Sequence, residues 1–173
     1  YAYLNPWKSV YDLKFLSEVL KNNIVVRVSE EPFEVGGIVY DRGTLVITRK
    51  GNETKKQQFD KLLRKLSKKY NTNLGSVTTG LVTKGKDFGS STMRVVKAPK
   101  VAVLSGEEVS SYNFGEVWHY FEQQIGYPIS VYDASEVQSL PLDEIDVLIM
   151  PEGGYGSFVN EISPSEKIVE ETN

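Results

Sequence analysis

The sequence predicts a mixed α/β protein made of two parts and a tail. A small α/β unit is expected over residues 1–98, the first part of a doubly wound sheet over 99–159, and a polar tail over 160–173. Three observations support this prediction. Apolar residues recur at helical spacing in several segments. Short β-branched runs bounded by Gly, Asn and Pro alternate with those segments. The charge of the chain changes sign near residue 100, which indicates a boundary there.

The charge is distributed unevenly along the chain. The 173 residues carry 20 Lys and Arg and 23 Asp and Glu, a net charge of −3. The net charge is −1 over residues 1–48, +11 over 49–100 and −13 over 101–173. We interpret this reversal as two solvated surfaces of opposite sign; alternatively, the halves or two copies attract each other electrostatically. Nucleic-acid binding is not expected, because the basic residues lack interleaved aromatic residues and no reader motif is present.

The composition excludes several classes of protein. The hydrophobic fraction of 40% and the charged fraction of 25% are ordinary for a globular protein. No run approaches the roughly 20 apolar residues needed to cross a bilayer, so no membrane span is expected. The absence of cysteine excludes disulfides, a thiol nucleophile and a thiolate metal site. Because the chain starts at Tyr1 and not at Met, we expect a processed chain or an excised part of a longer one.

The first unit is expected to open with a strand over 1–4. A helix then follows to Asn22, with Ser9 and Asp12 as a capping pair and an apolar stripe on one face. The apolar run at 24–28 predicts the next strand.

The middle of the first unit predicts a hairpin followed by a helix. In the hairpin segment 33–50, Gly36-Gly37 predicts one turn and Asp41–Gly43 another. Asn52 is placed to cap a helix over 53–70, whose lysines fall mostly opposite its apolar face. The Gly-, Ser- and Thr-rich remainder of the unit predicts strand and connection.

The second unit shows the pattern of a parallel sheet. Its first apolar run is continuous, which is typical of a buried parallel strand. The expected order is a strand at 100–104, a helix over 113–125 closed by Gly126, and strands at 129–134 and 146–151. This is the opening of a doubly wound α/β domain. The last strand is expected near an exposed edge covered by the tail or a partner, so we expect a homo-oligomer.

The only histidine of the chain belongs to an H-x-x-E pattern formed by His119 and Glu122. This pattern is half of the zinc site of several metallopeptidases, but a zinc site needs at least three protein ligands. At helical spacing His119 falls off the apolar stripe that contains Trp118 and Phe121. We therefore expect an ordinary surface pair, no metal ligand in this chain, and Trp118 and Phe121 holding the helix to the sheet.

The loops after the strands hold the candidate ligand-binding residues. In open α/β sheets, ligands bind outside the carboxyl ends of the strands. Those ends hold Ser105 and Gly106 after one strand and Gly153 and Gly154 after another. Exposed glycine amides can bind an anion or an oxyanion. The alternative is that the glycines only satisfy a tight turn.

No catalytic residue is expected. Ser105, Ser110 and Ser111 lie near a strand-to-helix turn, but no G-x-S-x-G elbow is present and no base is placed to activate them. Asn113 and Glu116 resemble a helix-capping pair, which explains polar residues here without chemistry.

Most of the chain resembles a known family. The stretch KVAVLSGEEVSSYNFGEVWHYFEQQIGYPISVYDASEVQSLPLDEIDVLIMPEGGYGSF resembles the class I glutamine amidotransferase-like domain that follows the catalytic domain in a group of bacterial zinc carboxypeptidase-like proteins. The stretches YAYLNPWKSVYDLKFLSEVLKNNIVVRV and FEVGGIVYDRGTLVI resemble the linking α/β region of those proteins. The most specific parts are VSSYNFGEVWHYFEQQ, DVLIMPEGG and DRGTLVI.

The resemblance implies a flavodoxin-like second domain in an extracytoplasmic parent protein. The parent would carry a metallocarboxypeptidase-like domain N-terminal to Tyr1, with two His and one Glu on zinc, so zinc is not expected on this chain. In true amidotransferases the glycine-rich loop at the position of Gly153-Gly154 helps form the oxyanion hole, and the nucleophilic Cys and its partners come later.

The resemblance therefore predicts a non-catalytic accessory or structural fragment whose partner is the parent's peptidase domain. The alternative is a degenerate amidotransferase or hydrolase-type enzyme, or an anion-binding module, whose site is completed by a partner chain.

Overall fold

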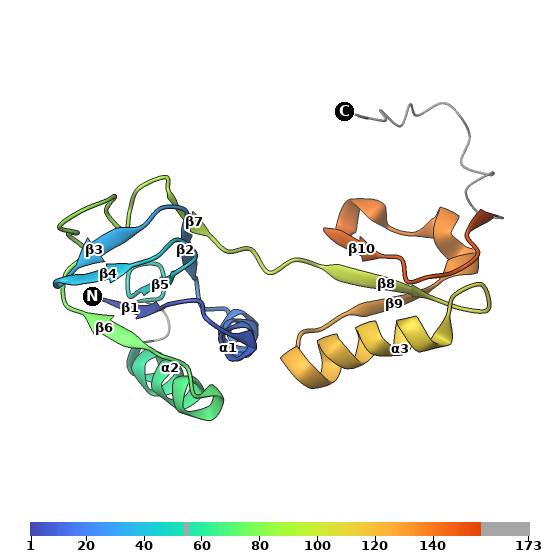
Figure 1. Cartoon of the computed structure of the whole chain (residues 1–173), viewed down its shortest axis with the longest axis horizontal. Helices are drawn as coiled ribbons and strands as arrows, with labels where there is room; N and C mark the ends of the chain where they lie inside the picture. Colours follow the sequence, from blue (N-terminus) through green and yellow to red (C-terminus); the bar gives the residue numbers. More distant parts are fainter. Residues whose placement is uncertain (54–55, 157–173) are drawn as a thin grey trace. The chain divides into compact units, whose positions relative to one another are not determined.

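The computed structural model describes residues 1–53 and 56–156, and they form two compact units (Figure 1). Unit 1 comprises Tyr1–Ala98 together with Ile125–Tyr127, and unit 2 comprises the other described residues. Both units combine helices and strands, so the expectation of a mixed α/β protein is confirmed. The expected tail at 160–173 lies outside the described residues.

Unit 1 is built on a five-stranded antiparallel sheet with the order β6-β1-β5-β2-β7. A two-stranded hairpin, β3-β4, forms a separate small sheet. The strands are β1 Ala2–Asn5, β2 Arg27–Ser29, β3 Phe33–Val35, β4 Ile38–Tyr40, β5 Leu45–Thr48, β6 Gly75–Val77 and β7 Met93–Val95.

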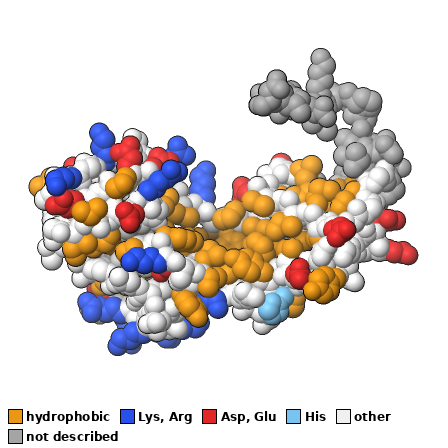
Figure 2. All heavy atoms as spheres, in the orientation of Figure 1, with side chains coloured by type: hydrophobic (Ala, Val, Ile, Leu, Met, Phe, Trp, Pro, Cys, Tyr) orange, Lys and Arg blue, Asp and Glu red, His pale blue; other side chains and the backbone are white. Residues whose placement is uncertain are grey.

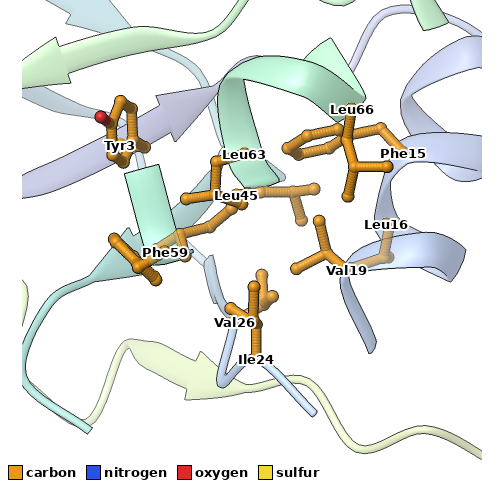
Figure 3. Packing of buried hydrophobic residues seen from close by; sticks show 11 residues of the cluster. Tyr3, Phe15, Leu16, Val19, Ile24, Val26, Leu45, Phe59, Leu63 and Leu66 are labelled. Atoms are coloured by element: carbon orange, nitrogen blue, oxygen red, sulfur yellow. The ribbon is translucent and has the colours of Figure 1, made fainter. Parts of the chain in front are cut away.

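Helices α1 (Val10–Lys21) and α2 (Lys56–Tyr70) pack on one face of this sheet (Figure 1). Figure 3 shows their apolar side chains converging with those of the strands. The buried cluster is Phe15, Leu16 and Val19 from α1, Phe59, Leu63 and Leu66 from α2, and Tyr3, Ile24, Val26, Leu45 and Ile47 from the strands and their flanks. The helical spacing of these residues in the sequence made this face predictable.

The opposite face of the sheet is covered by the hairpin and the loop that precedes β7. Alternate strand residues point to this face, and they meet side chains from both covering segments. The second buried cluster is Ala2, Leu4 and Val46 from the sheet with Phe33, Val35, Tyr40, Phe88 and Met93. Unit 1 is therefore a sheet with helices on one face and irregular β structure on the other.

Two local predictions in unit 1 are confirmed, the cap of α1 and the turn at Gly36-Gly37. Ser9 caps α1: its hydroxyl accepts a hydrogen bond from the Tyr11 amide at 3.2 Å, and the Asp12 carboxylate accepts one from the Ser9 amide at 2.8 Å. Gly36 and Gly37 both have positive φ, as the two-residue turn of a hairpin requires.

Two expectations in unit 1 need correction. The strand expected at 24–28 begins only at Arg27, because the backbone of Val25 bonds to the Asn52 side chain instead of to a strand. The hairpin expected over 33–50 includes only β3 and β4, since β5 leaves them and inserts between β1 and β2. Residues 54 and 55 lie outside the described residues, so the expected capping role of Asn52 stays a prediction.

Unit 2 contains a three-stranded parallel sheet with the order β10-β8-β9. Its middle strand is buried from Val101 to Leu104, which confirms the expected buried parallel strand. The elements are β8 Val101–Ser105, α3 Ser111–His119, a π-helical stretch Tyr120–Ile125, β9 Ser130–Asp133, 3₁₀ turns Ala134–Ser139 and Leu142–Glu144, and β10 Val147–Ile149.

The start of α3 differs from the expectation. The helix begins two residues before Asn113, and Ser110 is its cap, with its hydroxyl accepting a hydrogen bond from the Asn113 amide at 3.4 Å. The capping pair expected from Asn113 and Glu116 is therefore wrong. The Asn113 side chain instead donates to a Glu152 carboxylate oxygen at 2.8 Å.

The expected anchoring role of Trp118 is also wrong. The Trp118 side chain is 40% exposed, and no residue of α3 is buried. Because a helix is about 10 Å wide and strands lie roughly 4.8 Å apart, α3 can cover little more than two strands of the sheet, and its other side chains stay exposed. Phe114, near the start of α3, packs against the buried cluster around Leu104 instead.

Candidate functional site

The loops that follow β8 and β10 pair with each other at the carboxyl end of the unit 2 sheet. The Ser110 amide donates to the Glu152 carbonyl at 2.8 Å, and the Gly154 amide donates to the Glu108 carbonyl at 2.8 Å. Between these bonds Val109 and Gly153 form an antiparallel bridge. A short ladder therefore joins the two loops, and we call this region the rim.

Gly153 and Gly154 are held by close backbone packing. A Cβ at Gly153 would lie 2.5 Å from the Glu108 carbonyl oxygen and 3.1 Å from the Val109 Cα, which leaves room only for glycine. The amide of Gly154 is already bonded to the Glu108 carbonyl. The geometry therefore favours the tight-turn interpretation of the two glycines over the anion-binding one.

Ser105 and Gly106 lie at the same rim and contact the end of β9. The Ser105 hydroxyl donates to the Tyr132 carbonyl at 3.3 Å. Gly106 has a φ of +119°, and a Cβ there would lie 2.8 Å from a carboxylate oxygen of Asp133. Ser105 is thus engaged with the backbone of its neighbouring strand, and Gly106 makes room for Asp133.

Carboxylates dominate the charge of the rim. Asp133 accepts hydrogen bonds from the Ser135 hydroxyl at 2.7 Å and the Ser135 amide at 2.9 Å. Both bonds lower the pKa of Asp133, and the bond from the hydroxyl has the larger effect. Glu107, Glu108 and Glu152 lie on the two paired loops. An anion at this edge would meet repulsion from these groups.

The structure thus brings all four candidate residues, Ser105, Gly106, Gly153 and Gly154, to one rim. Sequence reasoning missed Asp133 and Glu152, which also lie there. Their signal was a polar residue at or shortly after the carboxyl end of a strand, the same signal that identified Ser105.

The H-x-x-E pair lies away from this rim, at the end of α3. His119 and Glu122 are both exposed. Within residues 1–53 and 56–156, no group of three His, Asp or Glu side chains is placed to hold a metal ion. None of the helices in the same ranges has the length and apolar character needed to cross a membrane.

Comparison with known proteins adds no relative. No protein-family model, curated protein or solved structure matches the chain.

Proposed function

We propose that this chain is a non-catalytic accessory part of a zinc carboxypeptidase-like protein, and that unit 2 has a flavodoxin-like, amidotransferase-like sheet. The strand order supports the fold. In chain order the parallel strands of unit 2 are β8, β9 and β10, and in space they lie as β9-β8-β10. This matches the 2-1-3 order with which flavodoxin-like sheets begin.

The closed glycine loop is the observation that carries the non-catalytic role. An oxyanion hole needs backbone amides aimed at the position where negative charge develops. The Gly154 amide is instead bonded to the Glu108 carbonyl at 2.8 Å, and the Ser105 hydroxyl is bonded to Tyr132. The carboxylate of Glu108 also lies close to Gly154. These contacts stiffen the rim and leave the loop poorly suited to stabilise an oxyanion.

The exposed apolar residues of unit 2 support a role in assembly. Among the described residues β10 pairs only with β8, and its Val147 is 45% exposed. Figure 2 shows hydrophobic side chains gathered on the surface of this unit. In this proposal a second copy or the parent's peptidase domain covers them. Zinc would belong to that peptidase domain, in an extracytoplasmic protein, and no residue of this chain would bind it.

The proposal is tested on the parent protein that it implies, with the peptidase domain included. We expect stoichiometric zinc in that protein and no loss of zinc in the His119→Ala variant, with the exposed Tyr112→Ala as the matched control. We also expect no ammonia release from glutamine. Zinc that disappears with His119, or glutamine hydrolysis that depends on a downstream cysteine, would overturn the proposal.

A further inference from the structure

Unit 1 contains a hollow of about 500 Å³ on the hairpin side of its sheet. The register places Arg27 opposite Val46 and Thr48 opposite Ala2, so Arg27 and Thr48 share the face that the hairpin covers. Phe88, from the loop before β7, is buried beside them. The volume lies within the range of small-ligand pockets.

Arg27 is one of the charged residues that line this hollow. It is half-buried, and its Nη1 donates to the Thr48 hydroxyl at 3.3 Å, while that hydroxyl donates to the Lys50 carbonyl at 2.7 Å. Thr48 therefore holds the guanidinium against the sheet. In the described part of the chain no ion pair involves Arg27 or Lys50. Most of the five N–H donors of the guanidinium are left for a ligand.

The side chains of the lining carry a net charge of +1, from Arg27 and Lys50 against Glu53. The Glu53 carboxylate accepts a hydrogen bond from the Gly51 amide at 2.9 Å and stays ionised at neutral pH. A ligand with one negative charge balances this lining, whereas a phosphate dianion would meet the repulsion of Glu53. The planar fork of Arg27 matches a carboxylate, which it can bind through two parallel bonds.

The aromatic wall of the hollow indicates the rest of the ligand. The rings of Tyr1 and Phe88 lie with their centroids 6.3 Å apart, and the Tyr1 ring is half exposed. Both residues line the same hollow as Arg27. An apolar group attached to the carboxylate would therefore have an aromatic surface to cover.

We propose that this hollow binds a small organic monocarboxylate, with its carboxylate on Arg27 and Lys50 and its apolar body against Tyr1. Benzoate is the simplest probe of this chemistry. Titration of the ¹⁵N-labelled chain with benzoate is expected to shift the amide signals of Lys50, Gly51 and Gly89. The signals of the unit 2 rim should stay in place.

Variants separate Arg27 from the general charge of unit 1. Arg27→Met is expected to raise the benzoate Kd at least about tenfold, because it removes charge-assisted hydrogen bonds. Arg27→Lys should recover only part of the affinity, since an ammonium cannot bind through a planar fork. Arg42→Met removes an exposed arginine outside the hollow and should leave the Kd unchanged. A folded Arg27→Met variant with wild-type affinity would overturn the proposal.

Two other ligands test the ligand class, and a second variant keeps the test decisive if Arg27→Met does not fold. Benzylamine has the same ring with a positive charge and should not bind, and inorganic phosphate should bind more weakly than benzoate. Tighter binding of phosphate or any binding of benzylamine at the same amides would contradict the assignment. If Arg27→Met does not fold, Lys50→Met replaces an exposed side chain and should weaken benzoate severalfold. An unchanged Kd in that variant would count against the site.

Discussion

At the scale of single residues, Asn52 makes a tertiary contact that no local sequence pattern encodes. Its side chain is only 4% exposed. Its amide oxygen accepts from the Val25 amide at 2.8 Å, and its amide nitrogen donates to the carbonyls of Val25 and Thr48 at 3.0 and 2.8 Å. Asn52 thus takes the place of a strand partner for Val25. An Asn before a helical segment is ordinarily a cap, so the sequence alone could not predict this bridge.

Replacing Asn52 should therefore destabilise unit 1. Asn52→Ala removes three hydrogen bonds and leaves buried backbone groups without partners, so we expect a loss of about 3 kcal/mol of unfolding free energy. Asn73→Ala changes an exposed side chain and should stay within about 0.5 kcal/mol of the wild type. Urea unfolding followed through unit 1 amide signals measures both variants. Equal midpoints for the two variants would show that the bridge contributes nothing.

A second residue-scale prediction concerns pH. The Tyr3 hydroxyl donates to Asp60 at 2.6 Å and Arg49 donates to the same oxygen at 2.7 Å. The hydrogen bond from Tyr3 makes the largest contribution to lowering the pKa of Asp60, and the bond from Arg49 lowers it further. The pKa of Tyr3 is raised, first by burial and then by its hydrogen bond to Asp60. Asp60 therefore binds a proton more readily in the unfolded chain than in the folded one, so its ionised form stabilises the fold. This stabilisation is complete above the ordinary Asp pKa of about 4, and it is lost as the pH falls through the lower pKa of the folded state.

Asp60→Asn should therefore lower the Tm of unit 1 at pH 7, and the difference from the wild type should shrink as the pH falls below about 4. Asp41→Asn, at an exposed carboxylate, is the control and should behave like the wild type. Thermal unfolding at a series of pH values measures the difference. A gap that stays constant from pH 7 to acid would contradict the role of the ionised carboxylate.

At the scale of elements, the segments with local signals were predictable and those placed by distant pairing were not. The capping box of α1 and the Gly36-Gly37 turn follow from residues within a few positions of each other. The insertion of β5 between β1 and β2 depends on partners more than 15 residues away, which no turn signal encodes. The rim of unit 2 was predictable in position, because parallel strands end at one edge. Its closure by the bridge between Val109 and Gly153 was not.

The paired loops give a prediction at the element scale. Gly153→Ala places a Cβ 2.5 Å from the Glu108 carbonyl, so the loops must separate, and we expect a loss of about 1–3 kcal/mol in unit 2. Gly115→Ala, in α3, meets nothing within 4 Å and should stabilise the same unit by about 0.5–1 kcal/mol. Hydrogen exchange of the Ser110 and Gly154 amides reports on the ladder directly. Protection that is unchanged in Gly153→Ala would refute the close packing.

At the scale of the whole molecule, the two units differ in how well their strands are covered. In unit 1 both faces of the antiparallel sheet carry buried clusters. In unit 2 the strands are parallel, and parallel sheets are normally covered on both faces. Yet Val131 and Val147, on the two flanking strands, are each 45% exposed. By register both side chains belong to the face that contains Val103, so this face of the unit 2 sheet exposes apolar side chains on both of its edge strands.

This difference predicts self-association through unit 2. Val147→Lys places a charge on the exposed β10 edge and should shift the chain toward monomer, because inward-facing charges oppose edge pairing. Val95→Lys makes the same change at an exposed valine on β7, an edge strand of the antiparallel sheet, and should leave association unchanged. Light scattering over a range of concentrations measures the mass of each variant. A wild-type chain that stays monomeric at high concentration would contradict the prediction, and so would association that is lost only in Val95→Lys.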